Sequence, residues 1–416
     1  MEQSKIEQIK KTLAETRLRR TTQRCITYEF KINVKKLNKS EYEKLKFMFV
    51  QCKWLYNYLL NSNKIEEFDL KSRDITSLDK DGNLVERKLD LPAKVIESVY
   101  KEIKTNLKTI SSIKKKGRKI GRLKFKSEYN SIDLNQYGVT HSLRGKGFKI
   151  NKFKRIIKVY GLEQLKDKNY EYANAKLIQK PTGYYIFLTC FENLTLNSVS
   201  KQVKEVGLDF GIKTNITTSD GEKFNIFIAE SERLKGLQKK LFRQVKGSNN
   251  RNKTIQKIRV EYEKLSNKKK DGANKLVSYL CTKYSTVYMQ DEMIGKWQKE
   301  LFGRQVQHSC LGTIKNKLKR QNNVQVIDKS LPTTKLCYNC GTVHRGITLS
   351  DRTFTCPTCH FSEDRDLKAS KTILFIGQCK NTYTPTEHRS TNVEKMLDFL
   401  NAYADKKLSS MKHESQ

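Results

Sequence analysis

EVGLDFGIKTNITTSDGEKF, residues 205–224, is predicted to form two strands joined by a tight turn. The Asp-Gly pair at 220–221 is typical of hairpins, because their turns need backbone angles that these residues tolerate. Apolar residues alternate along one face of the first strand: Val206, Leu208, Phe210 and Ile212. Asp209 shares the other face with Gly207 and Gly211, which would leave space for metal ions and a phosphate backbone. Taken alone, the stretch fits equally well an aspartate ending a strand in a glycine-rich turn.

A second acidic stretch, TVYMQDEM at 286–293, is predicted to be a strand. Because side chains alternate along a strand, Gln290 and Glu292 should face one way and Asp291 the other. Taken alone, this stretch is better interpreted as a strand that ends in solvent-exposed acids without a catalytic role.

A third group of acids lies in CHFSEDRDLKASKTIL, residues 359–374. Asp366 aligns at helical spacing with a small-to-apolar face made by three residues: Ala369, Ser370 and Ile373. Asp364 points to roughly the opposite side of this predicted helix. We therefore expect Asp366 to face inward, while Glu363 and Asp364 complement the helix dipole at its start.

The order of these acids is more informative than any one of them. The first lies on a hairpin strand, the second ends a later strand, and the third opens a C-terminal helix. An RNase H-like fold assembles carboxylates in this order around two divalent ions. Two ions about 4 Å apart can activate water and stabilise the leaving oxygen in phosphodiester hydrolysis.

Four cysteines form the strongest local motif, two Cys-x2-Cys pairs with fifteen residues between them: Cys337, Cys340, Cys356 and Cys359. Each pair lets two thiolates turn toward one ion, so the motif predicts a tetrahedral zinc-ribbon site. Four unligated buried cysteines are the alternative interpretation. Because four thiolates leave no open coordination position, we expect one structural Zn²⁺. His344 and His360 are predicted to be surface or loop residues.

The composition indicates a folded and strongly basic chain. Its 416 residues carry 83 Lys plus Arg against 44 Asp plus Glu, a formal net charge of +39, so we expect an anionic partner. No apolar run approaches the roughly 20 residues of a membrane-spanning helix, which argues against a membrane. Residues 1–24 lack the apolar block of a signal peptide and are predicted to form a basic helix. These features predict a cytoplasmic protein whose ten cysteines are reduced or bound to metal.

Helices interrupt a series of predicted strands in the first half of the chain. A strand at 25–34 precedes a helix through about residue 60, which a capping box at Ser40–Glu43 opens. A second helix follows, and then five strand-like segments between residues 131 and 191. This pattern predicts an antiparallel barrel interrupted by helices. A long helical region from about 230 to 284 contains a dense block of basic residues.

From about residue 25 to 390, the chain resembles the TnpB family of transposon-encoded RNA-guided DNA nucleases and their compact type V CRISPR relatives. The resemblance rests on these stretches: WLYNYLL, LPAKVIESVYKEI, GRLKFKS, GLDFGIKTNITTSDG, QHSCLGTIKNKL, LCYNCG, CPTCHFSEDRDLKAS and TPTEH. It implies an α+β fold with an N-terminal antiparallel β-barrel, a helical insertion and an RNase H-like (RuvC-like) α/β nuclease domain. The implied parts are a basic N-terminal extension (1–24), the β-barrel or wedge domain (25–38 and 120–203), a helical recognition insertion (39–119), the nuclease domain (204–336 and 360–380), an inserted four-cysteine zinc ribbon (337–359) and a C-terminal tail (381–416).

The resemblance also implies which acids are catalytic. Asp209 matches the first position and Asp366 the third, which the family places two residues before an Asn-Ala-Ala-type run. In this chain the run is Lys368-Ala369-Ser370, so a lysine replaces the usual asparagine. Together with a second acid, Asp209 and Asp366 would hold two catalytic Mg²⁺ ions.

The second acid departs from the family pattern. A simple overlay places Gln290 where the family has glutamate, and a neutral amide cannot hold a divalent cation as a carboxylate does. Glu292 projects from the same strand face about 7 Å further on and is our choice for the second catalytic acid. Asp291 is the alternative, although it should face away.

The implied function is that of an RNA-guided, Mg²⁺-dependent DNA endonuclease in the cytoplasm of a prokaryotic cell, associated with the nucleoid. Base pairing with a guide RNA and a short flanking DNA motif would choose the double-stranded target. Three basic residues are expected to contact nucleic acid: Arg122, Lys124 and Lys126. Gln290 motivates an alternative, a nuclease-inactive RNA-guided DNA-binding regulator. A DNA-joining transposase is a third possibility, which the interposed zinc ribbon disfavours.

Overall fold

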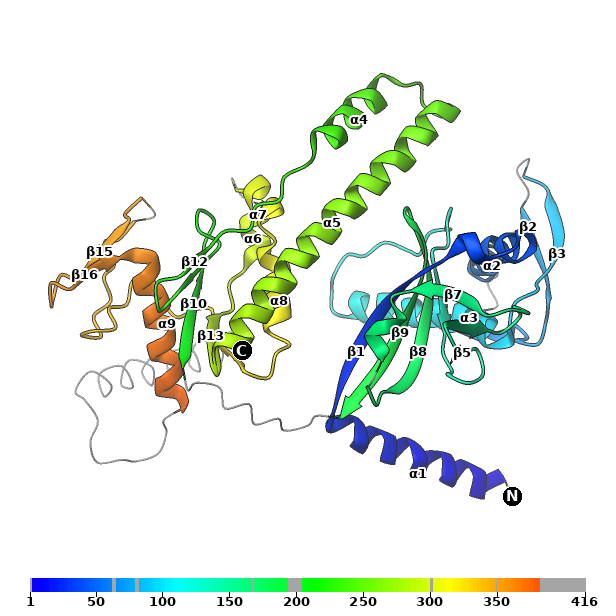
Figure 1. Cartoon of the computed structure of the whole chain (residues 1–416), viewed down its shortest axis with the longest axis horizontal. Helices are drawn as coiled ribbons and strands as arrows, with labels where there is room; N and C mark the ends of the chain where they lie inside the picture. Colours follow the sequence, from blue (N-terminus) through cyan, green and yellow to red (C-terminus); the bar gives the residue numbers. More distant parts are fainter. Residues whose placement is uncertain are drawn as a thin grey trace. The chain divides into compact units, whose positions relative to one another are not determined.

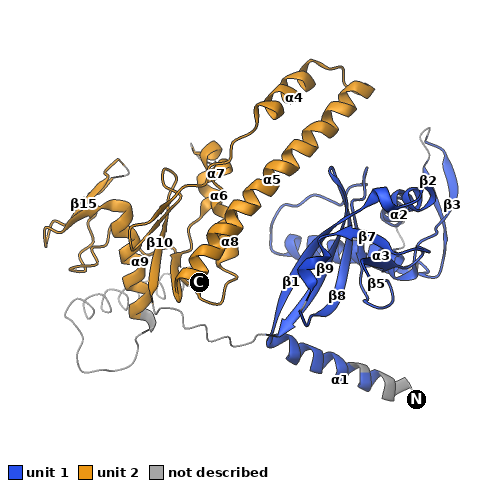
Figure 2. Ribbon diagram, in the orientation of Figure 1, with its two compact units in different colours: residues 1–196 blue, residues 197–416 orange. Residues whose placement is uncertain are grey.

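The computed structural model describes seven ranges of the chain: residues 2–61, 65–78, 82–166, 168–193, 204–299, 302–348 and 350–381. The chain forms two compact units, residues 1–196 and residues 197–416, and each is described by itself (Figure 2). Apart from Asn381, the predicted tail at 381–416 lies outside the described residues, and so does the TPTEH stretch. None of the helices in the described ranges has both the length and the apolar character that crossing a bilayer requires.

The first unit is built on an antiparallel sheet (Figure 1). In the described part of the unit, seven strands follow the order β4-β8-β9-β1-β7-β6-β5. Their bounds are β1 (Gln23–Ile32), β4 (Ser131–Leu134), β5 (His141–Arg144), β6 (Gly147–Ile150), β7 (Ile157–Tyr160), β8 (Glu171–Lys180) and β9 (Gly183–Asn193). Alternate residues of β9 are buried, as expected for a strand with one face in the core: Tyr184, Ile186, Leu188 and Cys190.

Helices flank and interrupt this sheet. Helix α1 (Glu2–Thr21) confirms the basic helix predicted for the start of the chain, and α2 (Lys39–Asn61) and α3 (Ala93–Lys115) lie between β1 and β4 in sequence. The predicted apolar face of α2 is buried, including Leu45, Phe49 and Cys52. Among the described residues of this unit, the shorter elements are three 3-10 helices and a hairpin: η1 (Val34–Lys36), η2 (Ile65–Glu67), η3 (Leu162–Leu165), β2 (Asp74–Leu78) and β3 (Leu84–Lys88).

The start of α2 differs from the prediction. Asn38 Oδ1 accepts a hydrogen bond from the Glu41 amide at 2.8 Å, and the Asn38 amide donates to Glu41 Oε2 at 3.4 Å. The capping box therefore joins Asn38 to Glu41, and the prediction that it starts at Ser40 is wrong. Because the helix begins one residue before Ser40, that serine already lies within its first turn.

The second unit contains a mixed sheet. Its described strands follow the order β12-β11-β10-β13-β14. The first three pair antiparallel, whereas β13 and β14 run parallel to β10. The predicted turn at Asp220-Gly221 joins β11 to β12, and the prediction of a single strand before it is wrong, because that segment divides into β10 and β11. The bounds are β10 (Glu205–Phe210), β11 (Ile216–Thr218), β12 (Lys223–Phe224), β13 (Thr286–Gln290) and β14 (Val324–Ile327).

Helices cover both faces of this sheet. The apolar face of β10, with Val206, Leu208 and Phe210, packs with residues of α5 (Asn249–Lys283) and α8 (Leu311–Leu318). Helix α9 (Arg365–Asn381) packs against Tyr288 and Ile327 of neighbouring strands. The remaining elements are α4 (Glu232–Arg243), α6 (Ile294–Lys299), α7 (Gly303–Ser309), β15 (Thr353–Thr355) and β16 (Ser362–Asp364). Because side chains alternate along β10, Asp209 lies on the α9 side of the sheet.

Candidate carboxylate site and zinc-ligand cluster

Asp209 is the centre of an acidic site in the second unit. Burial raises its pKa well above the ordinary value of an aspartate, and the nearby charges of Asp366 and Glu292 raise it further. The positive charges of Arg365 and Lys368 lower this pKa and offset the effect only in part. The structure therefore brings the three acids selected from the sequence into one electrostatic neighbourhood.

The glycines beside Asp209 pack against protein. A Cβ atom on Gly207 would lie 2.1 Å from the Ser370 carbonyl oxygen and 2.6 Å from the Leu374 amide nitrogen. A Cβ atom on Gly211 would lie 2.6 Å from the Thr214 carbonyl oxygen. The prediction that these glycines clear space for metals and phosphate is therefore wrong. Gly207 instead lets helix α9 approach β10, which carries Asp366 toward Asp209.

Asp366 lies in the first turn of α9, and its side chain keeps 26% of its surface exposed. Asp364 caps this helix by accepting hydrogen bonds from the amides of Asp366 and Leu367, both at 3.0 Å. This confirms the predicted helix-start role of Asp364. The same prediction is wrong for Glu363, which lies in β16 and pairs with Lys371. Antiparallel pairing of β16 with β15 holds Glu363 outside the helix.

Gln290 is occupied in a buried hydrogen-bond network. Its amide nitrogen donates to the carbonyl oxygens of Asp328 at 3.0 Å and Leu331 at 2.7 Å. Its amide oxygen accepts a hydrogen bond from the Thr333 hydroxyl at 2.8 Å. Because this pattern needs a donor and an acceptor on one side chain, a glutamine suits the position and a glutamate does not.

The two acids that follow Gln290 differ in their partners. Asp291 Oδ1 lies 2.9 Å from Lys315 Nζ and 2.6 Å from Lys319 Nζ, and Lys319, followed by Lys315, lowers its pKa. Burial raises the pKa of Glu292 instead, and within the described ranges its carboxylate makes no hydrogen bond or ion pair. The geometry therefore leaves Glu292, rather than Asp291, available to a cation beside Asp209.

The four predicted zinc ligands form a compact cluster. Their sulfur atoms all lie within 4.8 Å of one another, with Cys337 Sγ 3.8 Å from Cys359 Sγ and Cys340 Sγ 3.5 Å from Cys356 Sγ. Tetrahedral coordination at the usual Zn–S distance separates sulfurs by about 3.8 Å, so the cluster fits zinc. In the described part of the chain, this is the one group of three or more possible ligand atoms gathered so closely. His344 and His360 lie outside it, as predicted.

Lys368 connects the zinc-ligand cluster to the acidic site. Its side chain is fully buried, and Nζ donates hydrogen bonds to three carbonyl oxygens: Thr333 at 3.0 Å, Thr334 at 2.6 Å and Leu336 at 2.8 Å. The ammonium group also lies 4.0 Å from the ring centroid of Phe354 in β15. Burial lowers the pKa of Lys368 to about 8. The sequence marked this position only as a departure from asparagine, and no periodicity signals a buried cation.

The three basic residues predicted to bind nucleic acid lie in an irregular segment of the first unit. Arg122 and Lys124 are exposed. Lys126 Nζ instead lies 2.7 Å from Glu102 Oε1 and over the rings of Tyr56 and Tyr129 at 4.0 and 4.4 Å. The structure thus leaves Arg122 and Lys124 open to a ligand, while Lys126 has partners within the protein.

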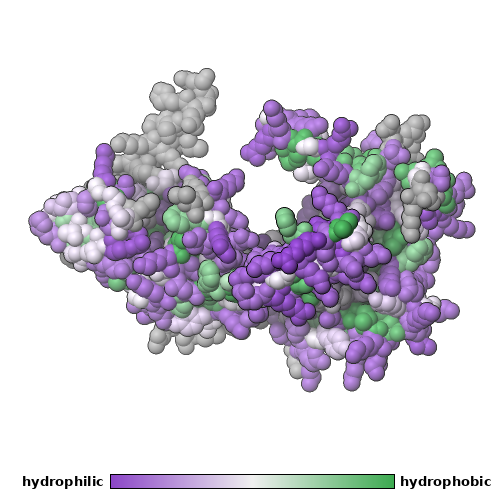
Figure 3. Space-filling view, turned by 90° about the horizontal axis from the view of Figure 1, so that it is seen from above, coloured by the Kyte–Doolittle hydropathy of each residue, from purple (hydrophilic) through white to green (hydrophobic). Residues whose placement is uncertain are grey.

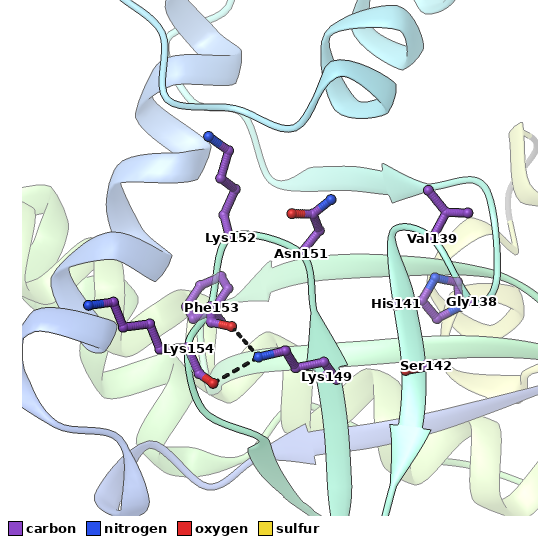
Figure 4. A pocket seen from close by; sticks show the side chains of 9 residues that line it. All are labelled: Gly138, Val139, His141, Ser142, Lys149, Asn151, Lys152, Phe153 and Lys154. Atoms are coloured by element: carbon purple, nitrogen blue, oxygen red, sulfur yellow. Dashed lines mark hydrogen bonds between the residues drawn. The ribbon is translucent and has the colours of Figure 1, made fainter.

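A pocket of about 490 Å³ lies elsewhere in the first unit, and sequence reasoning missed it (Figure 4). Lys149 points along its wall and donates to the carbonyl oxygens of Phe153 and Lys154, both at 2.8 Å. Both ring nitrogens of His141 have hydrogen-bond partners, and burial lowers its pKa to about 4. Because its main polar groups are occupied, we assign this pocket no role.

Comparisons with known proteins cover both the acidic site and the cysteine cluster. The family model described as "Cas12f1-like, TNB domain" matches residues 310–373, and that described as "Probable transposase" matches 189–297. The resemblance to the TnpB family is confirmed. The first match contains the four cysteines and Asp366, and the second contains Asp209 and Glu292.

Two curated relatives carry the names "Putative RNA-guided DNA endonuclease" and "Putative RNA-guided DNA endonuclease InsQ". The protein from Streptomyces pristinaespiralis is 29% identical over 203 residues, which cover 47% of this chain and 50% of the relative. The protein from Escherichia coli (strain K12) is 25% identical over 227 residues, which cover 49% of this chain and 56% of the relative. The chain therefore spans about half the length of the curated relatives it matches.

Proposed function

We propose that this chain is an RNA-guided DNA endonuclease that hydrolyses phosphodiester bonds with Asp209, Glu292 and Asp366. The observation that carries the proposal is the close packing of α9 on β10 at Gly207, which brings Asp366 toward Asp209; burial raises the pKa of Asp209, and the charges of Asp366 and Glu292 raise it further. Mutual repulsion among half-buried acids is costly unless a cation joins them. Asp366 has a cation partner, Arg365, whose Nη2 lies 3.4 Å from its Oδ1. Asp291 is paired with Lys315 and Lys319, whereas the Glu292 carboxylate makes no ion pair within the described ranges.

Two Mg²⁺ ions suit the donor set, because carboxylate oxygens are the hard ligands that Mg²⁺ prefers. Asp209 and Asp366 would hold the ions jointly, and Glu292 would complete their coordination. When bound, such ions supply charge stabilisation to both the attacking and the leaving oxygen of the phosphodiester. The chain's own contribution is to orient the carboxylates: β10 fixes Asp209, the Asp364 cap fixes the start of α9, and Gln290 anchors the end of β13.

The proposed architecture assigns residues 204–336 and 360–380 to a RuvC-like nuclease domain. The strand order β12-β11-β10-β13-β14, with an antiparallel hairpin followed by two parallel strands, supports an RNase H-like assignment. One structural Zn²⁺ would close the inserted ribbon at 337–359. In the first unit, the antiparallel sheet would be the wedge domain, and α2 and α3 would belong to the recognition insertion at 39–119.

The proposed partners are a guide RNA and double-stranded target DNA in a prokaryotic cytoplasm. A net charge of +39 supports binding to a phosphate backbone, with Arg122 and Lys124 as candidate contacts. Base pairing would read the target sequence, while the protein would read a short flanking motif. Such binding should weaken steeply as the salt concentration rises.

The test is guided cleavage by the purified full chain. RNA that co-purifies with the chain is sequenced, and a supercoiled plasmid carrying the matching target and its native flank is incubated with the complex and Mg²⁺. We expect cleavage by the native chain, loss of cleavage in Asp366→Asn, and retention in Asp364→Asn, because asparagine also caps helices. Undiminished cleavage by Asp366→Asn would exclude the assigned carboxylate.

A second candidate function is that of an RNA-guided DNA-binding regulator, because the chain has the neutral Gln290 where the family has a catalytic glutamate. The same experiment discriminates between the two. A complex that binds the target tightly but leaves it intact with both Mg²⁺ and Mn²⁺ would support the regulator and contradict the nuclease.

A further inference from the structure

The tip of the α4–α5 hairpin, where α4 ends at Arg243 and α5 begins at Asn249, exposes large apolar side chains. Phe242 keeps 91% of its surface accessible and Val245 keeps 76%. Figure 1 shows the two helices as a long hairpin that leads away from the sheet of the second unit, with the tip at its far end. Among the large hydrophobic residues exposed in the described ranges, Phe242 has the highest accessible fraction.

The tip is also strongly and uniformly cationic. From Arg233 to Val260 the sequence contains ten Lys or Arg residues and no Asp or Glu. Several of these cations are exposed and form no ion pair within the described residues: Lys239, Lys240, Arg243, Lys246 and Lys253. In the view of Figure 3, hydrophobic residues form separate patches in a largely hydrophilic surface on each unit. An apolar contact at the tip would therefore form within a field of positive charge.

Hydrogen bonds fix the turn that carries these residues. The Ser248 hydroxyl oxygen accepts from the Arg251 amide at 3.2 Å and caps α5. Arg251 Nη1 donates to the carbonyl oxygens of Leu241 at 2.6 Å and Gln244 at 3.0 Å, which closes the end of α4. Phe242 is thus presented from an ordered helix end, and binding through it would need little further ordering.

The charge selects the kind of partner. A second copy of this chain also carries a net charge of +39 and would be repelled, and an apolar protein surface would not use the cations. Single-stranded nucleic acid offers phosphates to the cations and the faces of unpaired bases to an aromatic ring. A blunt duplex offers the phosphates but keeps its bases stacked internally.

We propose that the α4–α5 tip is a binding site for single-stranded nucleic acid, in which Phe242 stacks on an unpaired base and the surrounding cations contact phosphates. The proposal rests on the proposed function, because guided cleavage requires that duplex DNA be opened and one strand displaced. It adds a specific contact surface that lies apart from the carboxylate site.

The test compares Phe242→Ala with Phe242→Tyr, a matched control that retains an aromatic ring. Both variants are made in the full chain with Asp209→Asn, so that the probes stay intact. Binding is measured by fluorescence anisotropy with a fluorescein-labelled single strand and with a blunt duplex of the same sequence. Phe242→Ala should weaken single-strand binding about 5- to 100-fold, because an unpaired base that stacks on an aromatic ring adds to the affinity. It should leave duplex binding within about twofold, because the bases of a duplex are not free to stack on the ring. Phe242→Tyr should bind both probes like its parent.

A charge variant separates stacking from electrostatics. Arg243→Gln should weaken binding to both probes and reduce the slope of log affinity against log salt by about one, whereas Phe242→Ala should leave that slope unchanged. Equal losses on both probes in Phe242→Ala, or no loss on either, would overturn the proposal. Binding of the same variants to anionic phosphatidylserine vesicles is measured as well. If Phe242→Ala lost affinity for the vesicles alone, the ligand would be a membrane surface and the proposal would be overturned. Because none of these measurements depends on cleavage, absence of guided cleavage with intact discrimination at Phe242 would contradict the proposed function alone.

Discussion

The ammonium group of Lys368 donates a hydrogen bond to the Thr333 carbonyl oxygen at 3.0 Å, although both residues are buried. The hydroxyl of the same threonine donates to Gln290 Oε1 at 2.8 Å. Lys368 and Gln290 are the two positions at which the chain departs from the family pattern at the proposed site. Both departures therefore hold the segment that leads into the cysteine cluster.

Lys368→Met should destabilise the protein. The substitution leaves three carbonyl oxygens without their donor, and we expect the free energy of unfolding to fall by about 2 kcal/mol, because burying an apolar methionine in place of an ammonium group offsets only part of this loss. Lys371→Met is the matched control, because Lys371 pairs with Glu363 near the surface and should contribute less than about 1 kcal/mol. Urea unfolding of the full chain measures both. Equal losses would mean that the buried network adds nothing.

Gln290→Glu should not restore a second catalytic acid at the family's usual position. Its carboxylate would face the carbonyl oxygens of Asp328 and Leu331, and both contacts would lack a donor. We expect the free energy of unfolding to fall by at least about 2 kcal/mol, and we expect no recovery of cleavage when this change is added to Glu292→Gln. Recovery in the double variant would show that position 290 can supply the acid.

Zinc should be bound once per chain and should stabilise the second unit. Cys340→Ser removes one of four ligands, so we expect loss of bound zinc and a lower melting temperature for that unit. Cys25→Ser is the control, because Cys25 is exposed and lies in β1 of the other unit. Metal analysis and calorimetry provide the readouts. A Cys340→Ser chain that retains its zinc and its melting temperature would contradict the ribbon assignment.

The raised pKa of Asp209 predicts a specific pH dependence. Because the folded pKa lies above the unfolded value of 3.8, the contribution to stability is complete below that value and is lost as pH rises through the folded pKa. In magnesium-free buffer, the stability of Asp209→Asn relative to the native chain should therefore increase as pH rises above 3.8 and through the folded pKa. Added Mg²⁺ should stabilise the native chain and have little effect on the variant.

Asp220→Asn provides a control of opposite sign. Burial opposes the shift, but hydrogen bonds from Thr218 and Tyr284 lower the Asp220 pKa to about 2. Its contribution to stability is present at neutral pH and is lost as pH falls through the folded pKa, so this variant should be less stable than the native chain at neutral pH. A pH profile of Asp209→Asn that parallels the native profile would contradict the electrostatic account.

Patterns that depend on local chemistry could be predicted from the sequence. The Asp-Gly turn between β11 and β12, the two Cys-x2-Cys pairs and the apolar periodicity of α2 each have one dominant physical cause, and each appears in the structure. The β2–β3 hairpin was missed because its strands are largely polar and exposed, so alternation gave little signal. Gly207 was misinterpreted because its partner, α9, lies more than 150 residues later in the chain.

The choice among the acids at 291 and 292 also needed the tertiary structure. The predicted strand at 286–293 is too long, because β13 ends at Gln290 and both acids follow it. Only the positions of Lys315 and Lys319 showed that Asp291 is paired with cations. The role of Lys368 could not be predicted at all. A buried lysine is uncommon, and its three acceptors come from a segment more than 30 residues earlier.

The most direct test of the proposed carboxylate site is the single-turnover rate of guided plasmid cleavage by Glu292→Gln and Asp291→Asn, with Asp209→Asn as the reference for full loss. Glu292→Gln and Asp291→Asn each remove one negative charge, and the two residues are adjacent in sequence, but only Glu292 is assigned to the site. We predict that Glu292→Gln loses at least about 100-fold in rate, close to Asp209→Asn, while Asp291→Asn stays within about threefold of the native chain. The reverse order, or a native rate in Asp209→Asn, would contradict the account.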